Sequence, residues 1–345
     1  MGTSPTRPPE TKLPDDYPGK TAVFPPEVSQ LVYAIFGIQA RDAGDSGVLV
    51  AELACHLERK SGPDAFERLR YVDPTGAHCE IFLAYWSDPE IYRSWFGQPA
   101  VREWWSALHL HCGPDVGLWL EEMTPHKDYY QYGAGVPQTG GLATLGSLVP
   151  CDKFGYWGGY RDRVPASVHD KFEPSMAKLS EPRSHDTLGK RLTVHTPDNI
   201  CFIREGQGWD RAGIEEREVW QQKMESVVDR WISELRDRPV ETGCLSLRAC
   251  REHAPETGVP LEKQSQIAFL LSLKHIERAA RATHSHLQVK SSFTQMYNEP
   301  RFEPKMHIWV EMLILKSGDL RTEYINCHPL TGLLPYFEPQ EAAVA

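Results

Sequence analysis

The sequence predicts an α+β protein in which two halves each follow the order strand, helix, strand, strand, helix, strand. Three observations lead to this prediction. Short segments alternate apolar and polar residues as strands do, longer segments between them carry apolar residues at helical spacing, and the same order recurs after a stretch rich in glycine and proline. This is the ferredoxin-like order, in which helices cover one face of an antiparallel sheet.

The first half is expected at residues 28–125, after a proline-rich arm at 1–27 that should be extended rather than folded. Ser87 and Glu90 flank Pro89 in a capping-box pattern, which predicts that a helix begins there. The expected elements are a strand at 31–40, a helix at 47–60, strands at 66–73 and 78–86, a short helix, a longer helix at 101–110, and a strand at 116–123.

The second half is expected at residues 199–337, between a connecting segment at 126–198 that wraps the domain and a tail at 338–345. Apolar residues with a period of 3.6 predict one long helix at 214–237. The other expected elements are strands at 199–205, 243–251, 265–273 and 304–318, with helices at 274–283 and 284–297.

The last of these strands has two faces of different character, because side chains alternate across a strand. One face is wholly apolar and consists of Met306, Ile308, Val310, Met312 and Ile314. We expect this face to meet the helices, so that His307 points into a space between the sheets of the two halves. The same alternation places Ser246 toward that space, where the two side chains can share a cavity.

Composition excludes several classes of function. The net charge is −10 and no long cluster of Lys or Arg is present, which argues against nucleic acid and anionic membranes as partners. The sequence contains no run of 18 apolar residues and no visible signal peptide, so we expect a cytoplasmic protein without a membrane span. Its eight cysteines form no C-x-x-C pair, as expected for reduced thiols.

Histidines are the candidate functional residues, although each also has an ordinary structural explanation. A single histidine in an apolar strand, such as His307, is more often a core residue. The segment "THSHLQV" places His284 and His286 at a helix start, where a histidine above a cavity can bind a metal or haem iron or simply face solvent. His109, His111 and Cys112 form a weaker cluster, since residues i and i+2 of a helix point apart.

Five ordered motifs point to one family. "YWGGYRDRVPAS", "DNICFIREGQGW", "GCLSLR", "THSHLQV" and "EYINCHPLTGLLPYF" resemble the haem-dependent aldoxime dehydratases, lyases that convert an aldoxime, R–CH=N–OH, to a nitrile and water. The resemblance implies a barrel-like tandem fold with haem b in a cavity. It also implies that the iron is ferrous in the active state, where it binds the nitrogen of the aldoxime substrate.

The resemblance implies a role for each of four residues. His286 is expected to be the axial ligand of the haem iron, and His307, which follows 21 residues later (307 − 286), the distal acid–base. Ser246 is expected to hold the substrate hydroxyl, and Arg163 to polarise it or to anchor a haem propionate. The family usually carries a glutamate where this sequence has Gln131, so the role of that carboxylate is open.

The sequence leaves several other residue roles and functions undecided. His328 in "NCHP" is expected to lie in a structural turn rather than to bind metal, and His284 is the alternative axial ligand. A peroxidase-like haem enzyme and a non-catalytic haem carrier or sensor are the alternative functions. The sequence fits a homodimer as well as a monomer, and it does not distinguish aryl from alkyl aldoximes.

Overall fold

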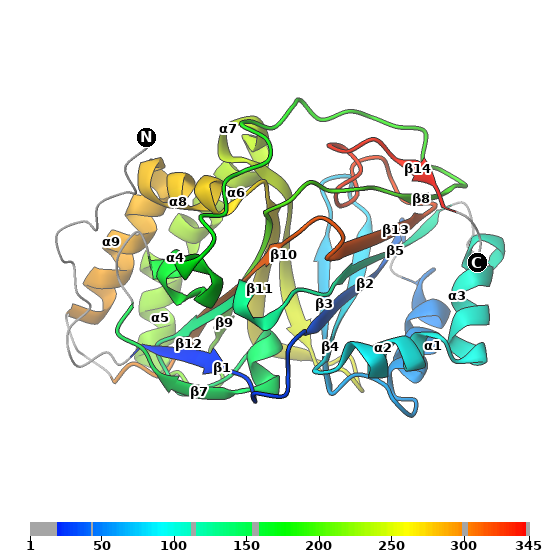
Figure 1. Ribbon diagram of the computed structural model, residues 1–345. Coiled ribbons are helices and arrows are strands. Elements are labelled where there is room, and N and C mark those ends of the chain that lie inside the picture. Colours follow the sequence, from blue (N-terminus) through cyan, green and yellow to red (C-terminus); the bar gives the residue numbers. More distant parts are fainter. Residues whose placement is uncertain (1–18, 43, 112–114, 154–158, 299–302, 343–345) are drawn as a thin grey trace.

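The computed structural model describes residues 19–42, 44–111, 115–153, 159–298 and 303–342. Within these residues, fourteen strands form one antiparallel sheet. The strand order is β14-β8-β13-β5-β2-β4-β3-β10-β11-β9-β12-β6-β1-β7. Helices cover the outside of the sheet in two separate groups, α1 to α3 on one side and α5, α6, α8 and α9 on the other (Figure 1).

The first half follows the predicted order of elements. Its four strands are adjacent in the order β5-β2-β4-β3, and its helices pack on the outer face of these strands. The elements are β2 (Val32–Ala40), α1 (Gly47–Leu57), β3 (Ala65–Val72), β4 (His78–Trp86), α2 (Pro89–Phe96), α3 (Pro99–His111) and β5 (Val116–Met123).

The start of α2 differs from the predicted capping box by one residue. The N-cap is Asp88, whose side chain accepts a hydrogen bond from the backbone N–H of Glu90 at 2.8 Å. Ser87 instead donates its hydroxyl to the carboxylate of Asp64 at 2.7 Å. Aspartate caps a helix as well as serine does, so the helix begins at the proline that the pattern indicated.

The second half repeats the plan with the strand order β10-β11-β9-β12. The long helix expected at 214–237 is divided at Met224 into α5 and α6. The elements are β9 (Ile200–Gly208), α5 (Ile214–Lys223), α6 (Glu225–Asp237), α7 (Pro239–Thr242), β10 (Cys244–His253), β11 (Pro260–Leu270), α8 (Leu273–Ala282), α9 (His284–Asn298) and β12 (His307–Leu315).

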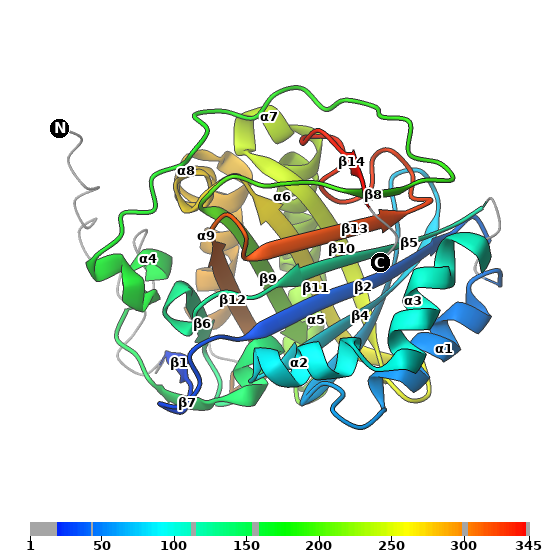
Figure 2. The same cartoon turned by 45° about the vertical axis from the view of Figure 1, so that its right-hand side comes forward.

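Segments outside the two halves extend the sheet at both ends. Residues 1–18 of the predicted arm lie outside the described residues, but Lys20–Val23 form a strand, contrary to the expectation of an unfolded arm. The stretch between α4 and β8 passes over the end of the molecule where α7 lies (Figure 2). These elements are β1 (Lys20–Val23), η1 (Lys127–Tyr129), β6 (Tyr130–Ala134), η2 (Gly141–Leu145), β7 (Ser147–Pro150), α4 (Gly159–Arg163), η3 (Pro165–Val168), β8 (Arg191–Thr193), β13 (Leu320–Ile325) and β14 (Gln340–Glu341).

The inner faces of the two halves share one hydrophobic core. Their sheets join through β3 and β10, and the combined sheet bends so that side chains from both halves meet. The rings of Tyr33 and Phe202, one from each half, have centroids 4.8 Å apart. The strand order has two ends, β14 and β7, so the sheet described here is open and the closed barrel-like arrangement is not observed.

The two faces of β12 are as the alternation predicted. Met306 and Ile308 pack with residues of α5, α6 and α9, and Met312 and Ile314 pack with residues of α8. Trp309 belongs instead to the core between the halves. Below, "outer face" means the side of the second half that its helices cover, and "inner face" means the side turned to the first half.

Two further expectations concern the whole chain. No disulfide joins any of the seven cysteines in the described residues. None of the helices found there combines the length and apolarity that crossing a membrane requires.

Candidate functional site

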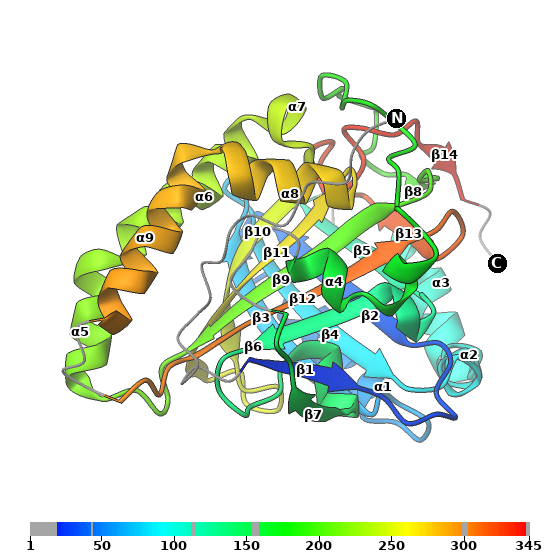
Figure 3. The same cartoon turned by 60° about the vertical axis from the view of Figure 1, so that its left-hand side comes forward.

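A cavity lies between the outer face of the second half and the helices α6, α8 and α9, with α4 at one side. Its empty space is about 530 Å³, including the part open to solvent. Figure 3 shows the helices that cover this face. Most of the lining residues are aliphatic, namely Ile203, Ile232, Leu235, Leu247, Ala268, Leu270, Ile276, Ala279 and Ala280.

His286, in the first turn of α9, lines this cavity. Its Nδ1 lies 2.7 Å from the carbonyl oxygen of Ala280, so Nδ1 carries the proton and donates, and the lone pair is on Nε2. Its ring packs against Trp231 with a centroid separation of 4.8 Å. Burial lowers the pKa of His286, so the imidazole is neutral at neutral pH.

These properties fit the predicted haem. A ligating histidine is neutral, and its second nitrogen is usually held by a carbonyl or carboxylate that fixes the tautomer. The aliphatic and aromatic walls suit a large apolar ring, and His286 is the one histidine among the described residues that line the cavity. The chemistry of these residues therefore fits a haem, and His286 is the residue whose imidazole could bind the iron.

Two polar groups face the cavity from its strands. Glu205 of β9 and Gln266 of β11 are directly opposite each other in the sheet and both line the cavity. Both amide atoms of Gln266 are bound to Gln207, at 2.9 and 3.2 Å. Burial raises the pKa of the Glu205 carboxyl. Glu205 is therefore a carboxyl group on an apolar cavity wall.

Arg163 lies behind one wall of the cavity. Its guanidinium stacks over the ring of Tyr160, which lines the cavity, at 5.2 Å from the ring centroid. Its Nε donates to the side-chain oxygen of Gln131 at 2.7 Å, and its Nη1 donates to the backbone oxygen of Lys153. Gln131 is buried, and its amide nitrogen has no hydrogen-bond partner among the described residues. Arg163 therefore approaches the cavity through Tyr160.

His307 lies on the inner face of the sheet, across from the cavity. Its ring stacks on Trp309, and its Nε2 is 3.4 Å from the hydroxyl of Tyr132. Burial lowers its pKa to about 4. At neutral pH the imidazole is therefore neutral, with one N–H group and one lone pair on its ring nitrogens.

Ser246 also lies on the inner face, as predicted, but it is not close to His307. Ser246 is in register with Phe269, Phe202 and finally Leu313 of β12. Leu313 is six residues from His307 along the strand (313 − 307), or about 20 Å, and three strand spacings add about 14 Å across the sheet. The structure does not bring these two residues together, because the shared core fills the space between the halves.

The remaining candidates are placed away from the cavity. His284 is exposed, and its Nε2 contacts the side chain of Gln288 at 2.9 Å. His328 accepts a hydrogen bond from the backbone of Leu330, which confirms that it lies in a turn. Cys112 is outside the described residues, and so are the side chains of His109 and His111. In the described part of the chain, no three His, Cys, Asp or Glu side chains gather as a metal site would require.

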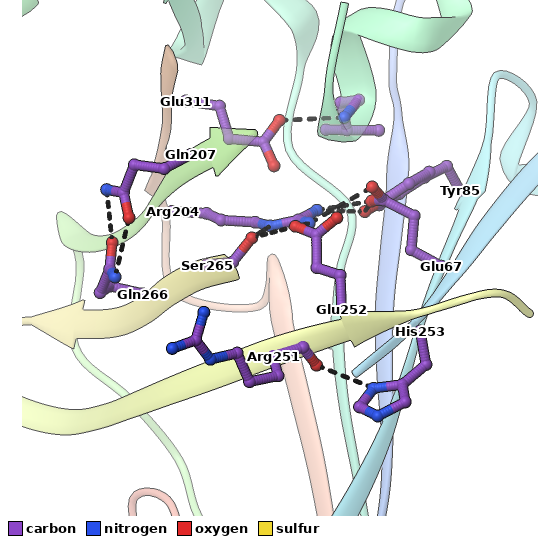
Figure 4. A network of polar contacts seen from close by, with 11 residues as sticks. Glu67, Tyr85, Arg204, Gln207, Arg251, Glu252, His253, Ser265, Gln266 and Glu311 are labelled. Atoms are coloured by element: carbon purple, nitrogen blue, oxygen red, sulfur yellow. Dashed lines mark hydrogen bonds and ion pairs between the residues drawn. The ribbon is translucent and has the colours of Figure 1, made fainter. Parts of the chain in front are cut away.

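A buried polar network crosses the inner face between the two halves (Figure 4). At its centre is Arg204, which is fully buried and forms ion pairs with Glu67 of β3 and Glu252 of β10. Arg204 also contacts Tyr85 and Ser265. The network fixes the inner faces of the two halves to each other.

Glu311 lies next to this network and is also completely buried. Its carboxyl accepts hydrogen bonds from the backbone N–H of Leu142 at 2.9 Å and from the hydroxyl of Tyr130 at 3.1 Å. Burial raises its pKa to about 8, so this carboxyl is protonated at neutral pH.

Two features of the site were not identified from the sequence. Glu205 is the last residue of the strand predicted at 199–205, and alternation from Ile203 places it on the outer face. Arg204 gave no signal, because its partners come from distant strands of both halves.

The chain is similar to a known family over most of its length. Residues 34–333 match the model of the family described as haem-containing dehydratase. The chain is 33% identical to phenylacetaldoxime dehydratase of Bacillus sp. (strain OxB-1) over 323 residues, which cover 93% of this chain and 92% of the relative. It is 27% identical to aliphatic aldoxime dehydratase of Pseudomonas chlororaphis, over 94% of this chain and 93% of that one.

The fold agrees with these sequence matches. The crystal structure of an aldoxime dehydratase in complex with butyraldoxime superposes with a TM-score of 0.84 at 25% identity, covering 96% of this chain and 94% of the other. The match thus includes both halves, the connecting segment and the helices around the cavity. Taken together, the family match, the identity to the Bacillus enzyme and the shared fold show that this chain belongs to the haem-containing dehydratase family.

Proposed function

We propose that this protein is a haem-dependent aldoxime dehydratase, a lyase that converts an aldoxime to the nitrile and water. The single observation that supports this best is His286, a neutral imidazole that faces an apolar cavity in a chain of this family. Relatives named as phenylacetaldoxime and aliphatic aldoxime dehydratases support the substrate class.

The chain's own residues account for binding and exclusion of water. When bound, haem supplies an electron-rich ferrous iron that can weaken the N–O bond of an aldoxime. His286 would hold that haem, and its bond to Ala280 keeps the imidazole in one tautomer. The aliphatic lining keeps water away from a reaction that releases water. The alkyl or aryl group of the substrate would pack against the same residues.

We also propose that each half is a ferredoxin-like unit and that the two units together form a barrel-like core. In chain order, the four strands of each half occupy sheet positions 4-1-3-2, as β5-β2-β4-β3 and, read in reverse, as β12-β9-β11-β10. This is the arrangement that the β-α-β-β-α-β order produces.

The function is tested with haem-loaded protein under anaerobic conditions. Phenylacetaldoxime and butyraldoxime are each incubated with the dithionite-reduced and the ferric protein, and nitrile is quantified per bound haem. We expect nitrile from at least one aldoxime, and only from the reduced protein. Equal activity of both oxidation states, or peroxide-dependent oxidation without nitrile, would support the peroxidase-like alternative instead.

The catalytic roles of His307 and Ser246 are implied by the family resemblance alone. Because both side chains lie on the inner face, away from the cavity, we expect that replacing either residue has a small effect on catalysis. We expect His307→Ala and Ser246→Ala to retain haem and to keep turnover per bound haem within about two-fold of wild type. Removal of a catalytic acid–base group would instead lower turnover by about 100- to 10,000-fold. A loss of that size in His307→Ala, with haem retained, would restore the catalytic assignment.

A second readout identifies a structural role for His307. Its pKa is about 4 in the folded protein and about 6.5 when unfolded. Between these values the unfolded state binds more protons, so the free energy of unfolding falls as the pH falls from about 6.5 toward 4. We expect this loss to be smaller in His307→Ala than in wild type, measured by urea unfolding.

Arg163 is expected to position Tyr160 rather than to touch the substrate. We expect Arg163→Ala to retain haem and to lose about 2- to 30-fold in turnover, since the cation–π contact with Tyr160 contributes about 0.5–2 kcal/mol. Arg161→Ala is the matched control, because Arg161 pairs with Glu277 instead. Haem loss in Arg163→Ala would indicate a propionate anchor, and unchanged kcat and KM would remove Arg163 from the site.

We further infer a cytoplasmic location, which is supported by the unpaired cysteines of the described residues. Light scattering of the haem-loaded protein decides between a monomer and a homodimer.

A further inference from the structure

We propose that Glu205 is the acid–base residue of the cavity, in the role that the family resemblance implies for His307. The inference rests on the proposed function and names the residue that carries the proton in it. Glu205 donates a proton to the departing hydroxyl of the aldoxime and then accepts the proton from its carbon.

The strand register places Glu205 on the outer face. Ile203 and Glu205 line the cavity, while Arg204 between them points to the inner network. Glu205 is directly opposite Val310 of β12 on one side and Gln266 of β11 on the other. On β12, therefore, the residue level with this carboxyl is Val310, and His307 lies three residues away on the opposite face.

The surroundings leave the carboxyl available for proton exchange. Both amide atoms of Gln266 are engaged with Gln207 (Figure 4). The lining includes no Lys or Arg among the described residues that would hold Glu205 ionised. A carboxyl on an apolar wall is the usual arrangement for an acid that must be protonated near neutral pH, and burial raises the pKa of Glu205 in that direction.

The titratable groups around Glu205 do not compete for this role. His286 is neutral and is held through Nδ1 by Ala280. Burial raises the pKa of Tyr160 well above its usual value, and the charge of Glu205 raises it further, whereas Arg163 lowers it. Tyr160 therefore stays protonated and can donate a hydrogen bond near the same carboxyl.

The step balances without an oxidant or a second reactant. The protonated carboxyl of Glu205 gives its proton to the hydroxyl oxygen as the N–O bond breaks, and water leaves with that electron pair. The carboxylate formed then removes the proton from carbon, and the C–H electron pair becomes the third carbon–nitrogen bond. The nitrile is released, and Glu205 is again protonated and ready for the next substrate.

Glu205→Gln tests the proposal, because it keeps size and polarity but removes the exchangeable proton. We expect the variant to bind haem and to give the wild-type spectral change on aldoxime binding. Its turnover per haem should fall by about 100- to 10,000-fold. Glu218→Gln, on the exposed side of α5, is the matched control and should be unchanged. Wild-type turnover in Glu205→Gln would overturn the proposal.

A second variant and a second readout keep the test independent of folding and of activity. Glu205→Asp retains a carboxyl, so we expect partial turnover with a shifted pH profile, whereas an unshifted profile would contradict the role. Infrared titration of haem-free protein should show a protonated-carboxyl band to which both Glu205 and Glu311 contribute, and part of this band should be lost in Glu205→Gln but not in Glu218→Gln. A band of undiminished intensity in Glu205→Gln would also overturn the proposal. If wild type forms no nitrile, the proposed function itself fails.

Discussion

Replacing His286 with alanine is expected to abolish haem binding. Its imidazole is the one histidine side chain among the described cavity-lining residues, and its tautomer is fixed by Ala280. Loss of an outer partner of a ligand typically costs about 10- to 100-fold in affinity, so loss of the ligand itself should exceed that. Haem content and the Soret spectrum of the purified variant measure the effect.

His284→Ala is the matched control, because it removes a histidine two residues earlier that is exposed. We expect it to bind haem normally. His286→Gly should recover a haem spectrum when imidazole is added, since the added ring can occupy the space of the side chain. Full haem content with an unchanged Soret band in His286→Ala would show that another residue binds the iron.

Replacing Arg204 with alanine is expected to destabilise the protein by about 3–5 kcal/mol, as when one partner of a buried ion pair is removed. Glu67 and Glu252 would lose their shared cation, and both come from strands at the junction of the halves. Arg204 also lies over the ring of Trp309, at 4.8 Å from its centroid. Urea unfolding at neutral pH measures the change.

Arg251→Ala on β10 is the control for Arg204→Ala, because Arg251 is exposed and should change stability by only about 0.5 kcal/mol. One combination of variants tests whether the network is the cause. Glu67→Gln should reduce the effect of Arg204→Ala, since fewer charges are then left unpaired. A loss below about 1 kcal/mol in Arg204→Ala would mean that water or other cations replace the guanidinium.

Much of the fold could be predicted because its elements have strong local patterns. The nine-residue strand β12 has one face packed on helices and one on the central core, and this division follows from alternation alone. The order of elements in each half was predicted for the same reason. The break at Met224 was not, because the apolar stripe continues through it.

What depends on contacts between distant segments could not be predicted. The cavity was expected between the two sheets, but large side chains such as Tyr33 and Phe202 fill that space. The insertion of β6 beside β12, which places Gln131 opposite Met312, also has no local signal. A register is fixed by tertiary pairing, and the sequence of one strand does not contain it.

For the candidate site, too, features with a local sequence signal could be predicted and features set by distant contacts could not. His286 was placed correctly on a helix above a cavity, because the helix start has a local signature. His307 was matched by its offset of 21 residues from His286, but it lies on the face away from the cavity. An offset along the chain does not determine the face of a strand, since a shift of one residue reverses it.

The position of the iron tests the account most directly. We predict that an anomalous-scattering map of the haem-loaded crystal will show one iron peak beside Nε2 of His286, between α9 and the outer face that carries Glu205. A peak on the inner face beside His307, or at the exposed His284, would contradict the account.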